Sequence, residues 1–426
     1  MKMSIRSLRP TPFSDDRSHP HVHVATGEDP YSNTREVLSQ IDLAAVNGKR
    51  VLLKPNAGRI ATANSGITTH PQVVAAALDA FLEAGASVAV GESPITGVRT
   101  IEALEATGIA SVARERNCPL IDMDARQPVH MIIEDGVALQ SLAVCPEVLE
   151  YDVVVSIPVM KTHMHTVVTL AVKNMKGCLW RRTKVDLHML PPIEDMNDKP
   201  LNIAIADMAS VLRPHLSIID GTTGMEGLGP SAGQAKKLDL VVAGIEPFAV
   251  DAVACTLMGL HAEDVPHLRI CAERGYGVID IARIQVNPAR WHDFLSPFER
   301  PPEYLSIQFP GITILDEMSC SACQSTVLVF LKRFRKLIFD SFPGQEKVTI
   351  AIGKGHQSVP CGTICIGNCT AQHKQQGVFV PGCPPVATQI LEMISETEPE
   401  VNETKLEADV PKRPSHPPTA MKEAKS

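Results

Sequence analysis

The sequence predicts an α/β protein with a large, mostly parallel sheet and helices on both faces, followed by a smaller cysteine-rich α+β domain. Two observations predict the large sheet: short apolar runs alternate with amphipathic segments at helical spacing, and polar residues directly follow the runs. Strands covered by helices on both faces are uniformly apolar, as these runs are. A third observation sets off the smaller domain, because six of the eleven cysteines fall between residues 320 and 383.

Composition limits the possible classes of protein. The chain has 426 residues and 44% apolar residues, enough for a large core divided among several domains. A net charge of -8 offers no basic field for nucleic acid, and no apolar window is long enough to span a membrane. The first residues contain no apolar leader, so we expect a cytoplasmic protein whose thiols stay reduced.

The elements of the larger domain follow from local signals. Val51–Leu53 is an apolar strand that ends in Lys-Pro-Asn, and Thr69 can cap a helix from His70 to Ala84 that Gly85 stops. Further strands are expected over Ser87–Val90, Asp152–Ile157, Leu216–Ile219 and Leu238–Ala243. Further helices are expected over Thr100–Arg116, Thr166–Gly177, Asn202–Leu212 and Pro247–Met258.

The composition and the pattern of apolar residues change near residue 300 and again near residue 396. Strands are expected over Glu303–Phe309, Thr313–Leu315 and Lys347–Ile352, and helices over Cys323–Phe339 and Ala387–Ile394. The predicted organisation is an extended polar arm over 1–45, an α/β core over 46–300, a cysteine-rich metal domain over 301–395 and a disordered tail over 396–426.

The carboxyl ends of the parallel strands should form a ligand cleft, because ligands of such sheets bind beyond these ends. Lysines there would make a positive pocket for a small anionic molecule, a carboxylate or a phosphate; facing solvent instead, they would be ordinary surface residues. The candidate catalytic residues are Lys161, His163 and Glu226. The candidate substrate-binding residues are Lys54, Asn56, Lys173, Asn174, Lys176, His188 and Asp220.

Several motifs in this region point away from nucleotides. The glycine-dense segment 221–230 follows a strand, but it matches neither the phosphate loop nor the dinucleotide fingerprint. His70 and His188 each have a structural interpretation, as a helix cap and as a lone packed histidine. Asp251 is expected to be a packing or capping carboxylate.

The cysteines form the strongest pattern. Cys320 and Cys323 make a CxxC pair, and Cys369 and Cys383 follow at a distance, so four thiolates could enclose a metal from two sides. Free core cysteines and disulfides are the alternatives. Zinc and an iron–sulfur cluster both accept four thiolates. The proline after Cys383 favours a cluster, most simply 4Fe–4S. The roles of Cys361 and Cys365 stay open.

The order of several motifs resembles the domain-of-unknown-function family 362, whose members are often labelled iron–sulfur centre proteins. The resemblance covers about residues 48–280. The matching motifs are Lys54-Pro-Asn, Thr68-Thr-His-Pro, Gly85-Ala through Gly91-Glu-Ser-Pro, Lys161-Thr-His, Lys173-Asn-Met-Lys-Gly, Leu212-Arg-Pro, Asp220-Gly, Met225-Glu-Gly and Asp251-Ala-Val. The separate ferredoxin module of many members is absent from this sequence, and the tail resembles the variant with CxxC, Gly-Asn-Cys and Val-Pro-Gly-Cys-Pro-Pro.

Taken together, these features predict an iron–sulfur redox protein that acts on a small anionic ligand and exchanges electrons with a redox protein partner. An isomerase or lyase with a structural zinc site is the first alternative. A non-catalytic electron-transfer protein is the second.

Overall fold

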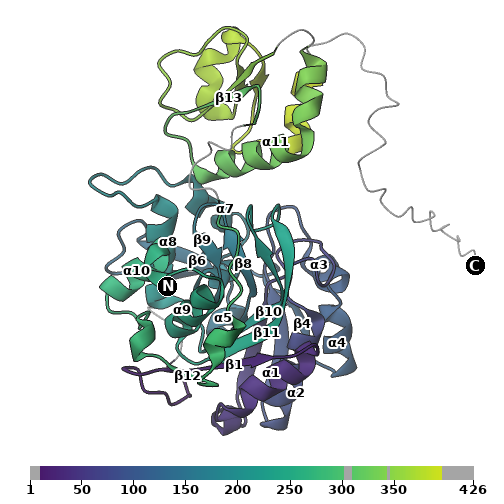
Figure 1. Cartoon of the computed structure of the whole chain (residues 1–426), viewed down its shortest axis with the longest axis vertical. Helices are drawn as coiled ribbons and strands as arrows, with labels where there is room; N and C mark the ends of the chain where they lie inside the picture. The colour runs from purple at the N-terminus through teal and green to yellow at the C-terminus, as the bar shows by residue number, and fades with distance from the viewer. Residues whose placement is uncertain (1–9, 302–308, 343–345, 396–426) are drawn as a thin grey trace, which may run out of the picture.

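A computed structural model describes residues 10–301, 309–342 and 346–395. The predicted strand over Glu303–Phe309 falls almost entirely outside these residues, and the predicted disordered tail over 396–426 falls wholly outside them. The described chain forms a large α/β domain and a smaller C-terminal domain beside it (Figure 1).

A ten-stranded sheet forms the centre of the large domain, with the main order β12-β1-β11-β10-β7-β2-β3-β4. Its strands are β1 (His21–Thr26), β2 (Arg50–Pro55), β3 (Ser87–Glu92), β4 (Leu120–Asp122), β7 (Val153–Ile157), β8 (Val159–His163), β9 (Val167–Thr169), β10 (Leu216–Glu226), β11 (Gln234–Gly244) and β12 (Gln285–Asn287). The run from β10 through β7, β2 and β3 to β4 is parallel, whereas β11 is antiparallel to both of its neighbours. A separate antiparallel pair joins β5 (Val129–Ile132) and β6 (Ser141–Val144).

Helices cover both faces of this sheet, as predicted (Figure 1). They are α1 (Pro30–Ser39), α2 (Pro71–Glu83), α3 (Thr100–Ala106), α4 (Ile109–Glu115), α5 (Glu147–Glu150), α6 (Ala171–Asn174), α7 (Thr183–Asp186), α8 (Pro200–Val211), α9 (Pro247–Leu257) and α10 (Pro266–Glu273). Short 3-10 turns include η2 (Met175–Cys178) and η3 (Leu187–Met189). Along β2 the side chains alternate between two cores: Leu52 packs with α8 and α9, and Leu53 packs with α1 and α2.

The smaller domain is built on four parallel strands in the order β13-β14-β15-β16, whereas the sequence predicted an α+β arrangement. Its elements are β13 (Ile312–Asp316), α11 (Ser321–Ser341), β14 (Val348–Ile352), β15 (Ile364–Ile366), η7 (Asn368–Gln376), β16 (Phe379–Val380) and α12 (Ala387–Ser395). In Figure 1 this domain lies above the large one, and α11 borders the side that faces it. None of the helices in the described ranges has the length and apolar character needed to cross a membrane.

Three sequence predictions need correction. The arm expected over 1–45 contains β1, which pairs with β11 and β12 inside the main sheet, and α1, which Asp29 caps. The helix expected over Thr166–Gly177 begins instead with a strand, β9, which is followed by the short α6, because the β-branched residues Val167–Thr169 pair with β8. The glycine-dense loop begins as strand, since β10 continues to Glu226.

The buried carboxylate of Asp207 provides a test of this packing. It accepts the N–H groups of Ala138 and Leu139 at 2.6 and 2.9 Å and pairs with Arg274 at 2.7 Å. We expect Asp207→Ala to lower the free energy of unfolding by about 3–5 kcal/mol, because Arg274 would lose its partner. Glu83→Ala removes an exposed pair with Arg35 and should cost about 0.2–1 kcal/mol. Urea denaturation of both variants measures the difference, and equal losses would contradict the prediction.

Candidate functional site

A buried ion pair anchors the carboxyl edge of the large sheet. Lys54 ends β2 and Glu92 ends β3, and their Nζ and Oε2 atoms lie 2.9 Å apart with side chains 0% and 2% exposed. The same carboxylate accepts the backbone N–H groups of Ala57 at 3.0 Å and Ser93 at 2.9 Å. The charge of Lys54 is therefore matched, and its role is to hold neighbouring side chains.

Those neighbours are two asparagines and a second lysine. Asn174 Oδ1 accepts from Lys54 Nζ at 3.2 Å and from Asn56 Nδ2 at 3.1 Å. Asn56 Oδ1 accepts in turn from Lys161 Nζ at 2.7 Å, and the carbonyl of Ile67 accepts from the same ammonium at 2.8 Å. Among the described residues, the ammonium group of Lys161 therefore has only uncharged hydrogen-bond partners. Burial and the nearby Lys173 hold its pKa well below the usual value.

Lys173 and Lys176 come from the short α6 and the η2 turn that follows it. Asp251 caps α6, as its predicted capping role requires, and accepts the N–H groups of Ala171 and Val172 at 2.7 and 3.0 Å. Lys173 is buried, and its Nζ reaches Thr169 Oγ1 at 3.4 Å. Burial lowers the pKa of Lys173 to about 7, and burial together with Lys173 lowers the pKa of Lys176.

The three lysines share one property. Within the described ranges, no carboxylate lies within salt-bridge distance of Lys161, Lys173 or Lys176. Unpaired buried ammonium groups are costly in a folded protein, so an anion is the partner that this arrangement lacks.

Three histidines lie beside the lysines. His163 ends β8, His165 follows it, and His188 lies in η3. The ring centres of His163 and His188 are 6.4 Å apart, and His165 is 5.8 and 6.2 Å from them. Burial and the nearby lysines hold the pKa of all three below the usual value, so the rings are neutral.

Hydrogen bonds define the tautomers of His163 and His188. The Nδ1 atom of His163 accepts the backbone N–H of His165 at 3.1 Å, so its proton is on Nε2. Ser321 donates its hydroxyl to the carbonyl of His188 at 3.2 Å, so the 2.9 Å bond between Ser321 Oγ and His188 Nδ1 uses the ring N–H. The Nε2 atom of His188 is then an acceptor. The site thus has one neutral ring that can donate and one that can accept.

Two predicted residues lie outside this cluster. Asp220 accepts the N–H groups of His70 and Thr222 at 2.7 and 2.9 Å, and burial raises its pKa, so it supports the start of α2. Glu226 pairs with Lys236 at 3.1 Å and accepts the N–H of Glu299 at 3.0 Å. Both carboxylates have partners of their own, which separates them from the lysines.

Sequence reasoning missed the contact between the two domains. Ser321 and Ser325 of α11 bond to His188 and His165 at 2.9 and 2.7 Å. Arg182, before α7, donates to the carbonyl of Cys383 at 2.9 Å. No local signal marks these pairs, because their members are more than a hundred residues apart.

Four cysteines of the smaller domain are close enough for Cys320, Cys369 and Cys383 to affect the ionisation of Cys323. Cys320 is the N-cap of α11, and a hydrogen bond with Cys323 lowers the pKa of Cys320 to about 6. The same bond, together with burial and the thiols of Cys369 and Cys383, raises the pKa of Cys323. The loops that carry Cys369 and Cys383 are joined by reciprocal bonds between Asn368 and Gly382 at 2.9 and 2.8 Å.

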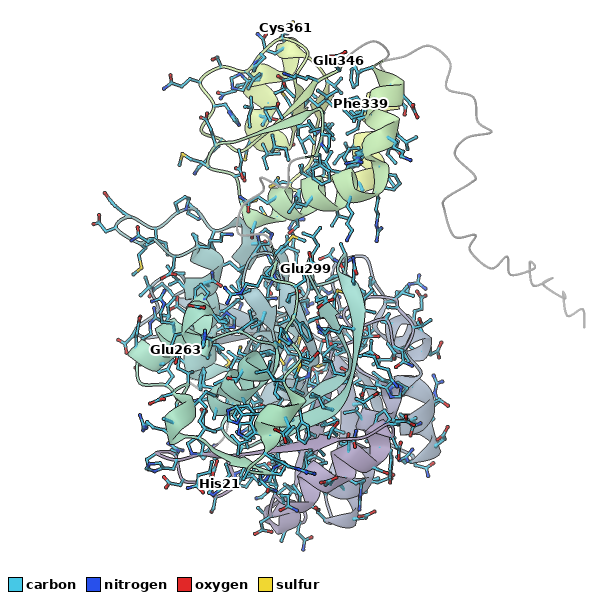
Figure 2. All side chains as sticks on the ribbon, in the orientation of Figure 1. His21, Glu263, Glu299, Phe339, Glu346 and Cys361 are labelled. Atoms are coloured by element: carbon cyan, nitrogen blue, oxygen red, sulfur yellow. The ribbon has the colours of Figure 1, made fainter. Side chains whose placement is uncertain are left out.

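This donor set fits a thiolate-held metal in its chemistry. The thiols of Cys320, Cys369 and Cys383 all oppose the ionisation of Cys323, and all four cysteines are free. In the ranges that the structure describes, no group of three or more potential ligands is already arranged around a common point. A metal would therefore have to draw the four sulfurs together. Cys361 lies at the outer end of the domain (Figure 2) and Cys365 is buried in β15.

Two cavities adjoin the large domain. One, of about 720 Å³, is lined by Phe13, His215, Glu246 and Tyr276 and lies near the amino ends of β7 and β10. The other, of about 430 Å³, is lined by His165 and Asn202 and adjoins the histidine cluster. The smaller cavity therefore lies beside the histidines at the carboxyl edge of the sheet, where ligands of such sheets bind.

Residues 51–256 match the model of a family described as domain of unknown function (DUF362). The thylakoid-associated protein sll1697 of Synechocystis sp. (strain ATCC 27184 / PCC 6803 / Kazusa) is 30% identical to this chain over 219 residues. The alignment covers 51% of this chain and 66% of that protein, just under two thirds of its length.

Two solved structures share parts of the fold. A protein from Thermotoga maritima matches with a TM-score of 0.34 and 16% identity, over 55% of this chain and 61% of that one. The lactate racemase apoprotein from Thermoanaerobacterium thermosaccharolyticum matches with a TM-score of 0.36 and 12% identity, over 79% of this chain and 70% of that one. At these scores neither structure contributes to the interpretation of the site.

Gly177 tests the anchoring ion pair. A Cβ atom at this position would lie 2.5 Å from Lys54 Nζ and 2.6 Å from Glu92 Oε1. We expect Gly177→Ala to destabilise the protein by about 1–3 kcal/mol, the usual cost of overpacking, and to weaken anion binding because Asn174 shifts with Lys54. Gly58→Ala is the control, since a Cβ there meets nothing within 4 Å. Unchanged melting and anion affinity in Gly177→Ala would show that the pair is not an anchor.

Proposed function

We propose that this chain, whose residues 51–256 match the model of the DUF362 family, is an iron–sulfur redox protein acting on a small anion. In this proposal, Lys161, Lys173 and Lys176 bind a carboxylate or phosphate group. Cys320, Cys323, Cys369 and Cys383 hold the cluster. The observation that carries the proposal is the set of buried lysines that have no carboxylate partner among the described residues. The start of α11 lies between them and the group of thiols around Cys323.

The lysines bind and orient the ligand. Each charge-assisted hydrogen bond to an anion is stronger than a neutral one, and burial excludes competing water. The bound anion also relieves the repulsion among the three ammonium groups, so binding and protonation of Lys173 reinforce each other.

The histidines move protons in the same cleft. His163 donates from Nε2 to an oxygen of the ligand, and His188 accepts a proton at Nε2. A cluster held by the four thiolates supplies one-electron transfer when it is bound. The hydrogen bond from His188 to Ser321 keeps this base in the required tautomer next to Cys320.

The same pair of neutral histidines favours a second candidate function. An isomerase or lyase needs a proton donor and a proton acceptor, which His163 and His188 would supply without any redox step. In that case the thiols would hold a structural zinc. Iron, zinc and acid-labile sulfide measured per chain after anaerobic purification separate the two candidates.

Lys173 gives the proposal a pH dependence. Burial lowers its pKa from the ordinary value of 10.5 to about 7 in the folded protein, so between these values the unfolded chain binds more protons than the folded one. The free energy of unfolding therefore rises with pH across this window, and below about 7 the full cost of burying the charge is present. Sulfate, whose charge is constant there, should bind more tightly below pH 7 than above it.

Lys173→Met tests both effects. It should abolish this rise of stability with pH and weaken sulfate binding about tenfold to a hundredfold, the equivalent of one charge-assisted bond of about 1.5–3 kcal/mol. Lys237→Met is the control, because that side chain is 70% exposed and pairs with Asp239. Thermal shift and sulfate titration report the result. Identical sulfate affinity in wild type and Lys173→Met would reject the anion pocket.

Cys383 tests the metal. Cys383→Ala should lose iron and sulfide after anaerobic reconstitution and destabilise the smaller domain, because metal binding there contributes folding energy. Cys361→Ala, at the outer end of the domain (Figure 2), should keep the full metal content. Unchanged metal per chain in Cys383→Ala would remove this cysteine from the ligand set.

A further inference from the structure

The cavity of about 430 Å³ is lined partly by polar side chains that have no role in the proposed function so far. It lies between the β8–β9 turn, the start of α8 and the start of α10, and its wall includes Met164, His165, Val167, Asn202 and Pro266. Four charged residues also line it: Lys199, Asp198, which pairs with Arg269, and Asp264 and Arg300, which pair with each other. Its volume falls in the range of small-molecule sites. None of the three candidate anion-binding lysines belongs to this wall, so it is a separate compartment next to the anion site.

Asn202 is the first notable group in this wall. It is 2% exposed, and its Nδ2 reaches the carbonyl of His165 at 3.5 Å. Its Oδ1 atom is buried without a hydrogen-bond partner among the described residues. A buried amide oxygen without a donor is destabilising, so this atom needs a donor that the described residues do not supply.

His165 is the second notable group in the wall of this cavity. Ser325 donates its one hydroxyl proton to the carbonyl of Ser321 at 2.8 Å. With that proton on the carbonyl of Ser321, the 2.7 Å contact between Ser325 Oγ and His165 Nε2 uses the ring N–H, and Nδ1 is an acceptor. This Nδ1 is also buried and unpartnered among the described residues. Burial and the neighbouring Lys199 and Lys173 lower the pKa of His165 to about 3, so Nδ1 stays unprotonated.

Asn202 Oδ1 and His165 Nδ1 are therefore both hydrogen-bond acceptors without a partner among the described residues, and both residues line the same cavity. We propose that this cavity receives the uncharged part of the anionic ligand and selects for hydroxyl groups that donate to Asn202 Oδ1 and His165 Nδ1. The inference rests on the proposed function, since the lysines hold the acidic end of the same molecule. The ligand class is a hydroxylated small carboxylate or phosphate.

Charge and position support this assignment. His165 belongs to both compartments, because its ring is 5.8 Å from that of His163 and also lines the cavity. A ligand anchored at the lysines would thus extend past His165 toward Asn202. An analogue without hydroxyl groups would bury both acceptors unpaired, and sites built to bond a hydroxyl discriminate strongly against such analogues.

Matched pairs of anions test the inference on the full-length protein. Glycerol 3-phosphate and n-propyl phosphate carry the same charge and differ in two hydroxyl groups, and glycerate and propionate form the corresponding carboxylate pair. Inorganic phosphate reports on the lysines alone. By calorimetric titration we expect the wild-type protein to prefer the hydroxylated member of at least one pair by about tenfold or more, the equivalent of one satisfied acceptor.

Asn202→Leu should remove most of this preference and leave the affinity for inorganic phosphate unchanged, which also reports that the variant is folded. Gln127→Leu, at an exposed amide, should keep the preference. Equal affinities within both pairs for the wild-type protein, with intact phosphate binding, would overturn this inference alone. If no anion binds the wild-type protein, the proposed function fails and the inference fails with it.

Discussion

The buried ion pair between Lys54 and Glu92 is the constraint on which the site depends. It joins the ends of β2 and β3 in a place with almost no solvent, where removing one partner would leave an uncompensated charge. From this pair a chain of hydrogen bonds runs through Asn174 and Asn56 to Lys161. Along this chain of hydrogen bonds the lysine charge becomes less well neutralised. Lys54 pairs with a carboxylate, whereas among the described residues Lys161 bonds only to an amide oxygen and a carbonyl oxygen. The fold thus neutralises the lysine that supports the site and leaves the next one to a ligand.

Helix α11 couples this cleft to the cysteines. Its first residues include Ser321 and Ser325, which bond to His188 and His165, while Cys320 and Cys323 occupy the same turn. Each serine has a single proton, and with that proton donated to a carbonyl group the histidine rings donate to the hydroxyl oxygens. The first turn of α11 thus contacts the cleft through its serines and also carries two of the four candidate thiolate ligands.

The strand ends could be predicted from sequence, and much of the site followed from them. Apolar runs located β2, β3 and β7, and the carboxyl-edge rule brought Lys54, Asn56, Lys161 and Asn174 to one place. Local sequence signals did not predict strands whose partners are distant in the chain. Strand β1 pairs with β11 across more than two hundred residues, and the polar residues around β1 suggested an extended arm instead. Glu226 could not be excluded in advance, because its partner Lys236 lies on the next strand. The contacts of α11 with the histidines depend on domain docking, for which the sequence has no periodic signal.

The lysine cluster and the cysteine cluster each bring groups of like charge together, positive in the first and negative in the second. Burial lowers the pKa of Lys161, Lys173 and Lys176 in the cleft, and the charge of Lys173 lowers the pKa of the other two further, so an anion is needed for all three to be charged. Cys369 and Cys383 oppose the ionisation of Cys323, because neighbouring thiolates cannot coexist without a cation. The overall charge of -8 does not relieve the lysines, since burial separates them from the surface carboxylates. Each cluster therefore needs a counter-charge from outside the chain. In the proposed function, the anion and the metal supply these charges on either side of the first turn of α11.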